Sequence, residues 1–113
     1  MNQHRIEQLK QMLQESPEDP FLLYALAMEH NNAQNHELAL QFYETLVSKH
    51  RHYVGTYYHL AKLYEQLQMN EKAKTCYENG MGIARQMGDH HAYNELNAAF
   101  KSFMGVEPDD EDF

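Results

Sequence analysis

Residues 57–77 read YYHLAKLYEQLQMNEKAKTCY, and residues 23–43, which precede them by 34 positions, read LYALAMEHNNAQNHELALQFY. In both stretches a leucine and an alanine stand side by side, and a second alanine follows that is itself followed four residues later by a tyrosine. The matching positions are Leu26/Leu60, Ala27/Ala61, Ala39/Ala73, Tyr43/Tyr77, Tyr24/Tyr58, Gln34/Gln68 and Glu37/Glu71. A period of 34 residues with two helical segments per copy predicts a stack of helix pairs.

The residue types at these matched positions fit close packing of helices. Small residues let two helices approach each other, and the aromatic residue fills the space against the neighbouring helix. The same residues at helical spacing would also suit an ordinary antiparallel bundle. The repeated order of the residues also fixes where the turns fall, and this favours the repeat.

The pattern resembles the tetratricopeptide repeat, in which Trp-x-x-Leu-Gly-x-x-Tyr is followed by Ala-x-x-x-Phe and then by Pro. Here Leu23 and Tyr57 replace the Trp, Ala27 and Ala61 replace the Gly, and tyrosines replace the Phe; no proline follows either copy. The resemblance covers Pro20 to about Arg85. It implies a small protein of bacterial type, all-α, with about six helices in a right-handed solenoid of antiparallel pairs.

Composition limits the possible functions of the 113-residue chain. The net charge of −8 argues against nucleic acid or an anionic membrane as a partner. We see no signal peptide and no apolar run of the ~20 residues that a membrane-spanning helix needs. Cys76 is the only cysteine, which excludes an intramolecular disulfide and favours a buried structural thiol. Together these features predict a cytoplasmic protein.

The chain divides into a repeat domain over residues 1–104 and an acidic segment over 105–113, which its charge predicts to be disordered. Within the domain we expect an amphipathic helix over 3–15, which is either the surviving half of a degenerate repeat or an unrelated cap. Repeat 1 covers 20–53, repeat 2 covers 54–87, and a capping helix covers 89–103. The first helix of the second copy is expected from Tyr53 to Leu67. The expected N-caps are Asp19, Asn35, Asn70 and Asp89. Gly88 suits a helix C-terminus, and Gly80 marks either a close helix contact or a kink.

The sequence shows no motif of an enzyme. A phosphate-binding glycine loop, a nucleophile elbow and a metalloprotease His-Glu-x-x-His are all lacking. The close histidine pairs, His50/His52 and His90/His91, have no Cys or carboxylate at a ligand spacing, so we expect no metal site and no cofactor. His30 occupies a core-type position that Tyr64 holds in the second copy.

The resemblance implies a concave groove, lined by the first helix of each repeat, as the functional surface. The groove residues carried over in this way are Phe21, Tyr24, Met28, Asn31, Tyr58, His59, Lys62, Glu65 and Tyr93. The Lys/Arg and Asn clamp that some members use for a terminal carboxylate is absent, and an aromatic and Met-rich groove suits an apolar or amphipathic segment instead. We therefore expect a non-catalytic protein–protein interaction module that binds a peptide or helix. The alternative is a structural homodimer whose groove is filled by its own or a partner chain's helix.

Overall fold

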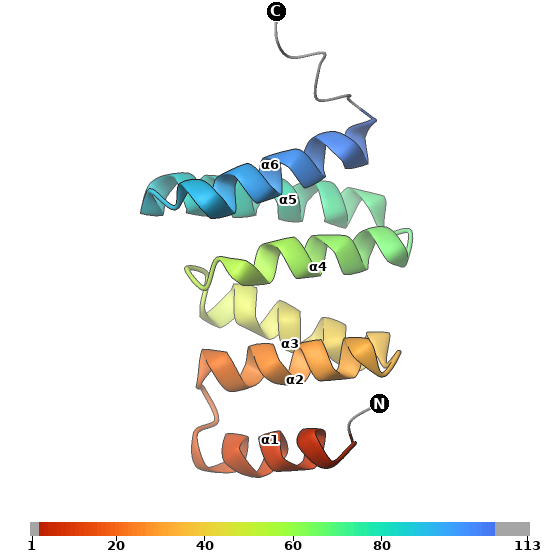
Figure 1. Cartoon of the computed structure of the whole chain (residues 1–113), viewed down its shortest axis with the longest axis vertical. Coiled ribbons are helices and arrows are strands. Elements are labelled where there is room, and N and C mark those ends of the chain that lie inside the picture. Colours follow the sequence, from red (N-terminus) through yellow and green to blue (C-terminus); the bar gives the residue numbers. More distant parts are fainter. Residues whose placement is uncertain (1–2, 106–113) are drawn as a thin grey trace, which may run out of the picture. The chain divides into compact units, whose positions relative to one another are not determined.

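The computed structural model describes residues 3–105, and this part of the chain forms six α-helices and no strand (Figure 1). The helices are α1 (Gln3–Glu15), α2 (Pro20–Asn32), α3 (His36–Lys49), α4 (Gly55–Gln66), α5 (Asn70–Met87) and α6 (His90–Met104). The predicted all-α class with six helices is confirmed. The predicted disordered segment lies outside the described residues, except for Gly105, which ends α6 in the left-handed conformation.

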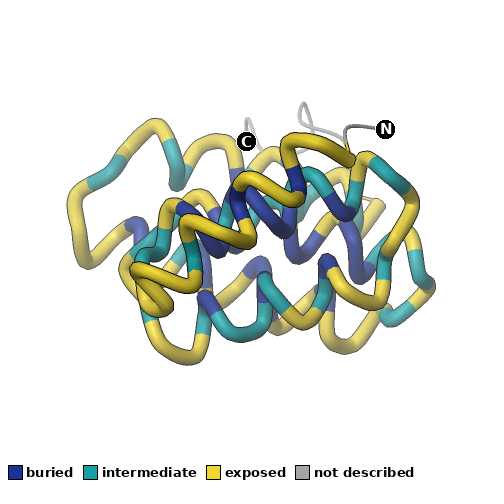
Figure 2. The backbone as a smooth tube through the Cα atoms, turned by 90° about the horizontal axis from the view of Figure 1, so that it is seen from below, coloured by how far each residue is buried: buried dark blue, intermediate teal, exposed yellow. Residues whose placement is uncertain are grey.

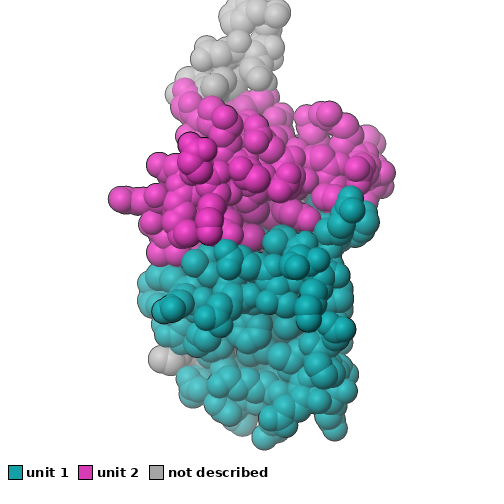
Figure 3. Space-filling view, turned by 180° about the vertical axis from the view of Figure 1, so that it is seen from behind, with its two compact units in different colours: residues 1–56 teal, residues 57–113 magenta. Residues whose placement is uncertain are grey.

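The chain divides into two units, residues 1–56 and residues 57–113, which are coloured separately in Figure 3. Unit 1 contains α1, α2 and α3, and unit 2 contains α5, α6 and α4 from Tyr57 onward. Buried and exposed positions alternate along the helices, so each helix has a buried side and an exposed side (Figure 2).

Unit 1 is built around α2, which packs against both α1 and α3. The core cluster of this unit joins α1 to α2 and consists of Ile6, Leu9, Leu22, Ala25 and Leu26. Partly buried Leu13 and Phe42 pack against this cluster from α1 and α3. The apolar face of α1 is thereby covered, as its amphipathic pattern requires.

Unit 2 depends on a close approach at Gly80 of α5. A Cβ atom at this position would stand 2.5 Å from the Cβ of Tyr57 and 3.1 Å from Cδ1 of Leu96, so only glycine fits without displacement of its neighbours. Tyr77, one turn earlier, is fully buried, and its ring centroid lies 5.8 Å from that of Phe100 and 5.7 Å from that of Phe103. These contacts confirm the close-contact interpretation of Gly80.

Most predicted helix ends are confirmed. The Asp19 carboxylate accepts a hydrogen bond from the Phe21 amide at 2.9 Å, and the Asp89 carboxylate accepts one from the Ala92 amide at 3.0 Å. Each satisfies an amide that the first turn leaves free. Gly88 adopts the predicted left-handed conformation with a φ of 70°.

Two predicted ends are wrong, and a third is right but lacks the expected side-chain bond. Met69, not Asn70, is the N-cap of α5, because Asn70 is already the first helical residue. The prediction of Asn35 as the N-cap of α3 is confirmed, although its side chain makes no capping bond. Instead it contacts the ring of His30. The predicted start of α4 at Tyr53 is wrong, because the Tyr53 carbonyl accepts a hydrogen bond from the Thr56 amide in a turn and the helix begins at Gly55.

Candidate partner-binding surface

The predicted groove residues of unit 1 lie along α2. Phe21, in its first turn, is 54% exposed. Tyr24 is half-buried, with its ring centroid 6.4 Å from that of Tyr43 and 5.6 Å from that of Tyr53. Tyr24 therefore contributes to the packing of its own unit, and its side chain is only partly exposed.

The other two predicted residues of α2 are also tied to their own chain. The Tyr43 hydroxyl donates to the Met28 sulfur at 3.1 Å, and burial, followed by the proximity of Tyr24, raises the pKa of Tyr43 well above its usual range. The Asn31 side-chain oxygen accepts a hydrogen bond from Nδ1 of His36 at 3.1 Å. Of the four, Phe21 is the residue that the structure leaves most exposed.

In unit 2 the predicted residues form a stripe along α4. Tyr58, Lys62 and Glu65 are spaced by four and three residues, which places them on one face of the helix. Leu60, Leu63 and Tyr64 are buried on the other side. His59 stands beside the stripe, with its ring centroid 5.3 Å from that of Tyr58 in an edge-to-face arrangement. We call Tyr58, His59, Lys62 and Glu65 the α4 stripe.

The carboxylate of Glu65 is held by a hydrogen bond from α5. Buried Tyr77 donates its hydroxyl to Oε2 of Glu65, and the ammonium of Lys62 lies 3.8 Å from the same oxygen. Burial and the hydrogen bond with Glu65 both raise the pKa of Tyr77 far above its usual range, so the phenol stays protonated and keeps donating. Glu65 thereby places a fixed negative charge beside the ammonium of Lys62.

Helix α6 contributes a residue that the sequence reasoning missed. Glu95 is close enough to His59 to favour the imidazolium, although burial has the larger effect and lowers the pKa of His59. Glu95 is exposed, so the edge of the α4 stripe carries a negative charge.

Tyr93, the remaining predicted residue, has a different local partner. The Arg85 guanidinium lies 5.0 Å from the centre of the Tyr93 ring and donates to its hydroxyl at 2.8 Å. Both residues line a hollow of about 220 Å³ between the end of α5 and the start of α6, together with Ala84, Gly88, Asp89 and His90.

The sequence of α6 does repeat the pattern of α4, but at a spacing of 36 residues instead of 34. Tyr93-x-x-Leu96-Asn97-x-x-Phe100 repeats the order of Tyr57-x-x-Leu60-Ala61-x-x-Tyr64. Leu96 is buried, as Leu60 is. Helix α6 thus has the pattern of a first helix of a further repeat, which a strict 34-residue period conceals.

Other chemistry is limited in the described residues. Over residues 3–105, no cluster of three or more His, Cys, Asp or Glu side chains is placed to hold a metal ion. In the same residues, no helix is both long and apolar enough to cross a membrane. The Cys76 thiol is buried, donates to the Tyr57 carbonyl at 3.4 Å, and has its pKa raised by burial to about 12. The expectation of a buried structural thiol is confirmed.

Comparisons with known proteins agree on the family. Residues 54–87 match the family model described as tetratricopeptide repeat. A comparison with curated proteins gives no match. Two structures of a tetratricopeptide repeat domain protein from Salinibacter ruber are similar at 44% sequence identity. The NMR structure has a TM-score of 0.76 over 81% of this chain and 93% of that one, and the crystal structure a TM-score of 0.75 over 80% and 100%.

A third structure, a D159K mutant of MamA, shares the fold at 16% identity, with a TM-score of 0.61 over 91% of this chain and 65% of that one. The two Salinibacter structures carry the stronger evidence, because they combine high identity with nearly complete coverage of their own chains. The chain belongs to the tetratricopeptide repeat family.

Proposed function

We propose that the protein is a non-catalytic interaction module that binds a peptide or helix segment of a partner protein along the first helices of its repeats. Its family typically mediates protein–protein interactions. The observation that carries the proposal is the α4 stripe, which presents an aromatic ring, an ammonium and a carboxylate on the outward face of a helix whose inner face is buried.

The chemistry of the stripe indicates the kind of segment that it suits. Tyr58 offers a rigid apolar ring with a polar end, and Lys62 offers a cation 3.8 Å from the Glu65 carboxylate. A segment with an apolar residue beside an acidic one would complement both groups. The exposed carboxylate of Glu95 then disfavours a second acidic residue at the edge of the stripe.

The experiment begins with a partner identified by affinity capture from the native cell and prepared in pure form. Calorimetric titration then compares wild type with Tyr58→Ala and Lys62→Ala. Truncation of a central interface aromatic commonly costs ~2 kcal/mol or more, so Tyr58→Ala is expected to weaken binding by roughly 30-fold. Lys74→Ala, on an exposed part of α5, is the matched control and is expected to bind as wild type does.

Two results would reject the proposal. If Tyr58→Ala and Lys62→Ala bind the purified partner as tightly as Lys74→Ala does, the stripe is not the binding surface. If light scattering finds a stable dimer at micromolar concentration that Tyr58→Ala converts to monomer, the surface serves self-association instead.

A further inference from the structure

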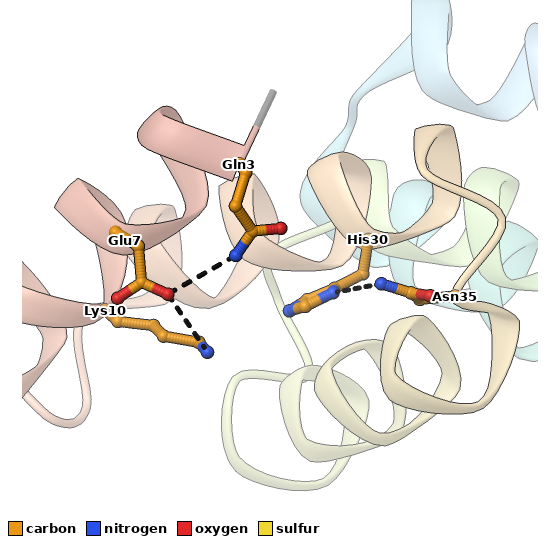
Figure 4. A network of polar contacts seen from close by, with 5 residues as sticks. All are labelled: Gln3, Glu7, Lys10, His30 and Asn35. Atoms are coloured by element: carbon orange, nitrogen blue, oxygen red, sulfur yellow. Dashed lines mark hydrogen bonds and ion pairs between the residues drawn. The ribbon is translucent and has the colours of Figure 1, made fainter. Parts of the chain in front are cut away.

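The histidine at the end of α2 is buried inside unit 1 and contacts two other segments. His30 is 4% exposed, and its ring is stacked on that of Phe42 of α3 with centroids 5.7 Å apart and an angle of 7° between the planes. Its Nδ1 lies 3.3 Å from the side-chain nitrogen of Asn35 (Figure 4). The His30 backbone carbonyl also accepts a hydrogen bond from the Asn35 backbone amide at 2.8 Å. A ring nitrogen that faces an amide NH₂ group must accept, so this arrangement favours the neutral imidazole.

The charged group of α1 that affects the protonation of His30 is a lysine. Lys10 disfavours the imidazolium by charge repulsion. The carboxylate of Glu7 lies 3.8 Å from the Lys10 ammonium and accepts a hydrogen bond from Gln3 at 3.3 Å, so it is already engaged on α1 (Figure 4).

The acidic groups of the other two helices are turned elsewhere. Glu29, which precedes His30 on α2, lies 3.8 Å from the Arg5 guanidinium. On α3, Glu37 and Glu44 are about 140–160° around the helix axis from Phe42, the residue that meets His30. His36, the other titratable group at the start of α3, is hydrogen-bonded to Asn31. A positive charge on His30 would therefore meet Lys10 and no free carboxylate.

An apolar hollow lies next to His30's neighbours Lys10 and Phe42, where α1 meets the rest of unit 1. Lys10 and Phe42 line an apolar hollow of about 390 Å³ together with Leu13, Gln14, Pro17 and Leu26. Leu26 at its floor is fully buried and belongs to the core cluster that α1 covers. Phe42, the residue that stacks on His30, therefore also borders the hollow beside α1.

We propose that His30 is an acid-sensitive latch whose protonation weakens the packing of α1 on α2 and α3 and exposes the apolar cluster beneath α1. Protonation places a charge in a desolvated site beside Lys10 and turns Nδ1 from an acceptor into a donor that faces the Asn35 amide. Rotation of that amide can restore the hydrogen bond, but it removes neither the desolvation nor the repulsion.

The direction of the pH dependence follows from the environment of the ring. Burial, and after it Lys10, lower the pKa of His30 below its ordinary value of 6.5. The unfolded chain then binds the proton more tightly than the folded chain. The contribution of His30 to stability is complete above pH ~6.5 and is lost as the pH falls below that value.

The second copy of the repeat supplies a matched variant. Tyr64 occupies the position equivalent to His30, is 7% exposed, and has a ring that carries no charge at mildly acidic pH. His30→Tyr therefore keeps an aromatic ring at this position and removes its titration. His30→Gln, which is neutral and smaller, is the second variant, and His4→Gln, at an exposed histidine of α1, is the control.

The test compares urea unfolding midpoints at pH 7.5 and pH 5.5 and records NMR spectra of the full chain at both values. We expect the midpoints of wild type and His4→Gln to fall on acidification by clearly more than those of His30→Tyr and His30→Gln. We also expect the amide signals of Ile6 and Leu9 in wild type to broaden or shift at pH 5.5. The latch is rejected if both His30 variants lose as much stability as wild type, or if the α1 signals do not respond to acidification.

Discussion

Two glycines of α5, Gly80 and Gly82, differ in how closely other residues pack against them. A Cβ atom at Gly80 would overlap Tyr57 at 2.5 Å, whereas one at Gly82 would have no neighbour within 4 Å. We expect Gly80→Ala to destabilise the fold by roughly 1–3 kcal/mol through overpacking. Gly82→Ala is expected to stabilise it by about 0.5–1 kcal/mol, because alanine is the better helix former. Urea unfolding measures both, and stabilisation by both changes would show that the close contact at Gly80 is absent.

The two alanines at the matched position of the second helices are the next residue-scale test. Ala39 and Ala73 are both fully buried, as the repeat pattern predicts. Replacement of either by leucine adds three carbon atoms to a filled space, and we expect a loss of roughly 1–3 kcal/mol in unfolding free energy. Ala98→Leu, at an exposed position of α6, is the control and is expected to leave stability nearly unchanged.

The thiol of Cys76 can report on opening of unit 2. Its pKa of about 12 leaves almost no thiolate at neutral pH, and its side chain is buried. Because the thiolate is the reactive form, we expect iodoacetamide to label the native protein much more slowly than the urea-unfolded protein at the same pH. Equal labelling rates would mean that the native thiol is accessible.

At the scale of the element, the ends of α2 and α6 depend on aspartates that cap their first turns. Loss of the hydrogen bond from the Ala92 amide in Asp89→Ala is expected to lower the unfolding free energy by about 1 kcal/mol. Asparagine is as good an N-cap as aspartate, so Asp89→Asn should retain most of the stability. If Asp89→Asn loses as much unfolding free energy as Asp89→Ala, the carboxylate stabilises the helix through its charge and not through the capping hydrogen bond.

The helices and most of their ends follow from the sequence because they rest on local rules, such as an aspartate before a first turn or a glycine at the left-handed end of α5. Asn35 shows where local rules fail, since buried His30 competes for its side chain. The missed pattern of α6 has a different cause: 36 residues separate Tyr57 from Tyr93, so a fixed period does not align them.

The candidate surface was harder to predict than the helices. The spacing of Tyr58, Lys62 and Glu65 predicts that they share one face of α4. It does not predict that Glu65 accepts a hydrogen bond from Tyr77, because Tyr77 belongs to another helix. Likewise, the sequence placed Met28 in the groove without showing that its sulfur accepts a hydrogen bond from Tyr43. Partners supplied by other helices depend on side-chain conformations, which the repeat period does not determine.

At the scale of the whole molecule, charge is unevenly distributed along the sequence. The last seven residues, 107–113, contain five of the 17 acidic residues and one large apolar residue, Phe113. From this composition we expect little gain in free energy from ordering the segment, because it offers little apolar surface and its charges repel one another. We therefore expect a chain that ends at Val106 to keep the circular dichroism spectrum and the melting temperature of the full chain.

The ionic strength of the buffer provides the control for this truncation. The removed charges are negative and add to the excess of negative charge in the chain, so any effect of their loss should be a small stabilisation at low salt. Screening at ~1 M salt, where the Debye length is about 3 Å, should abolish that difference. A marked fall in melting temperature on truncation, at low or high salt, would instead show that residues 107–113 pack against the repeats.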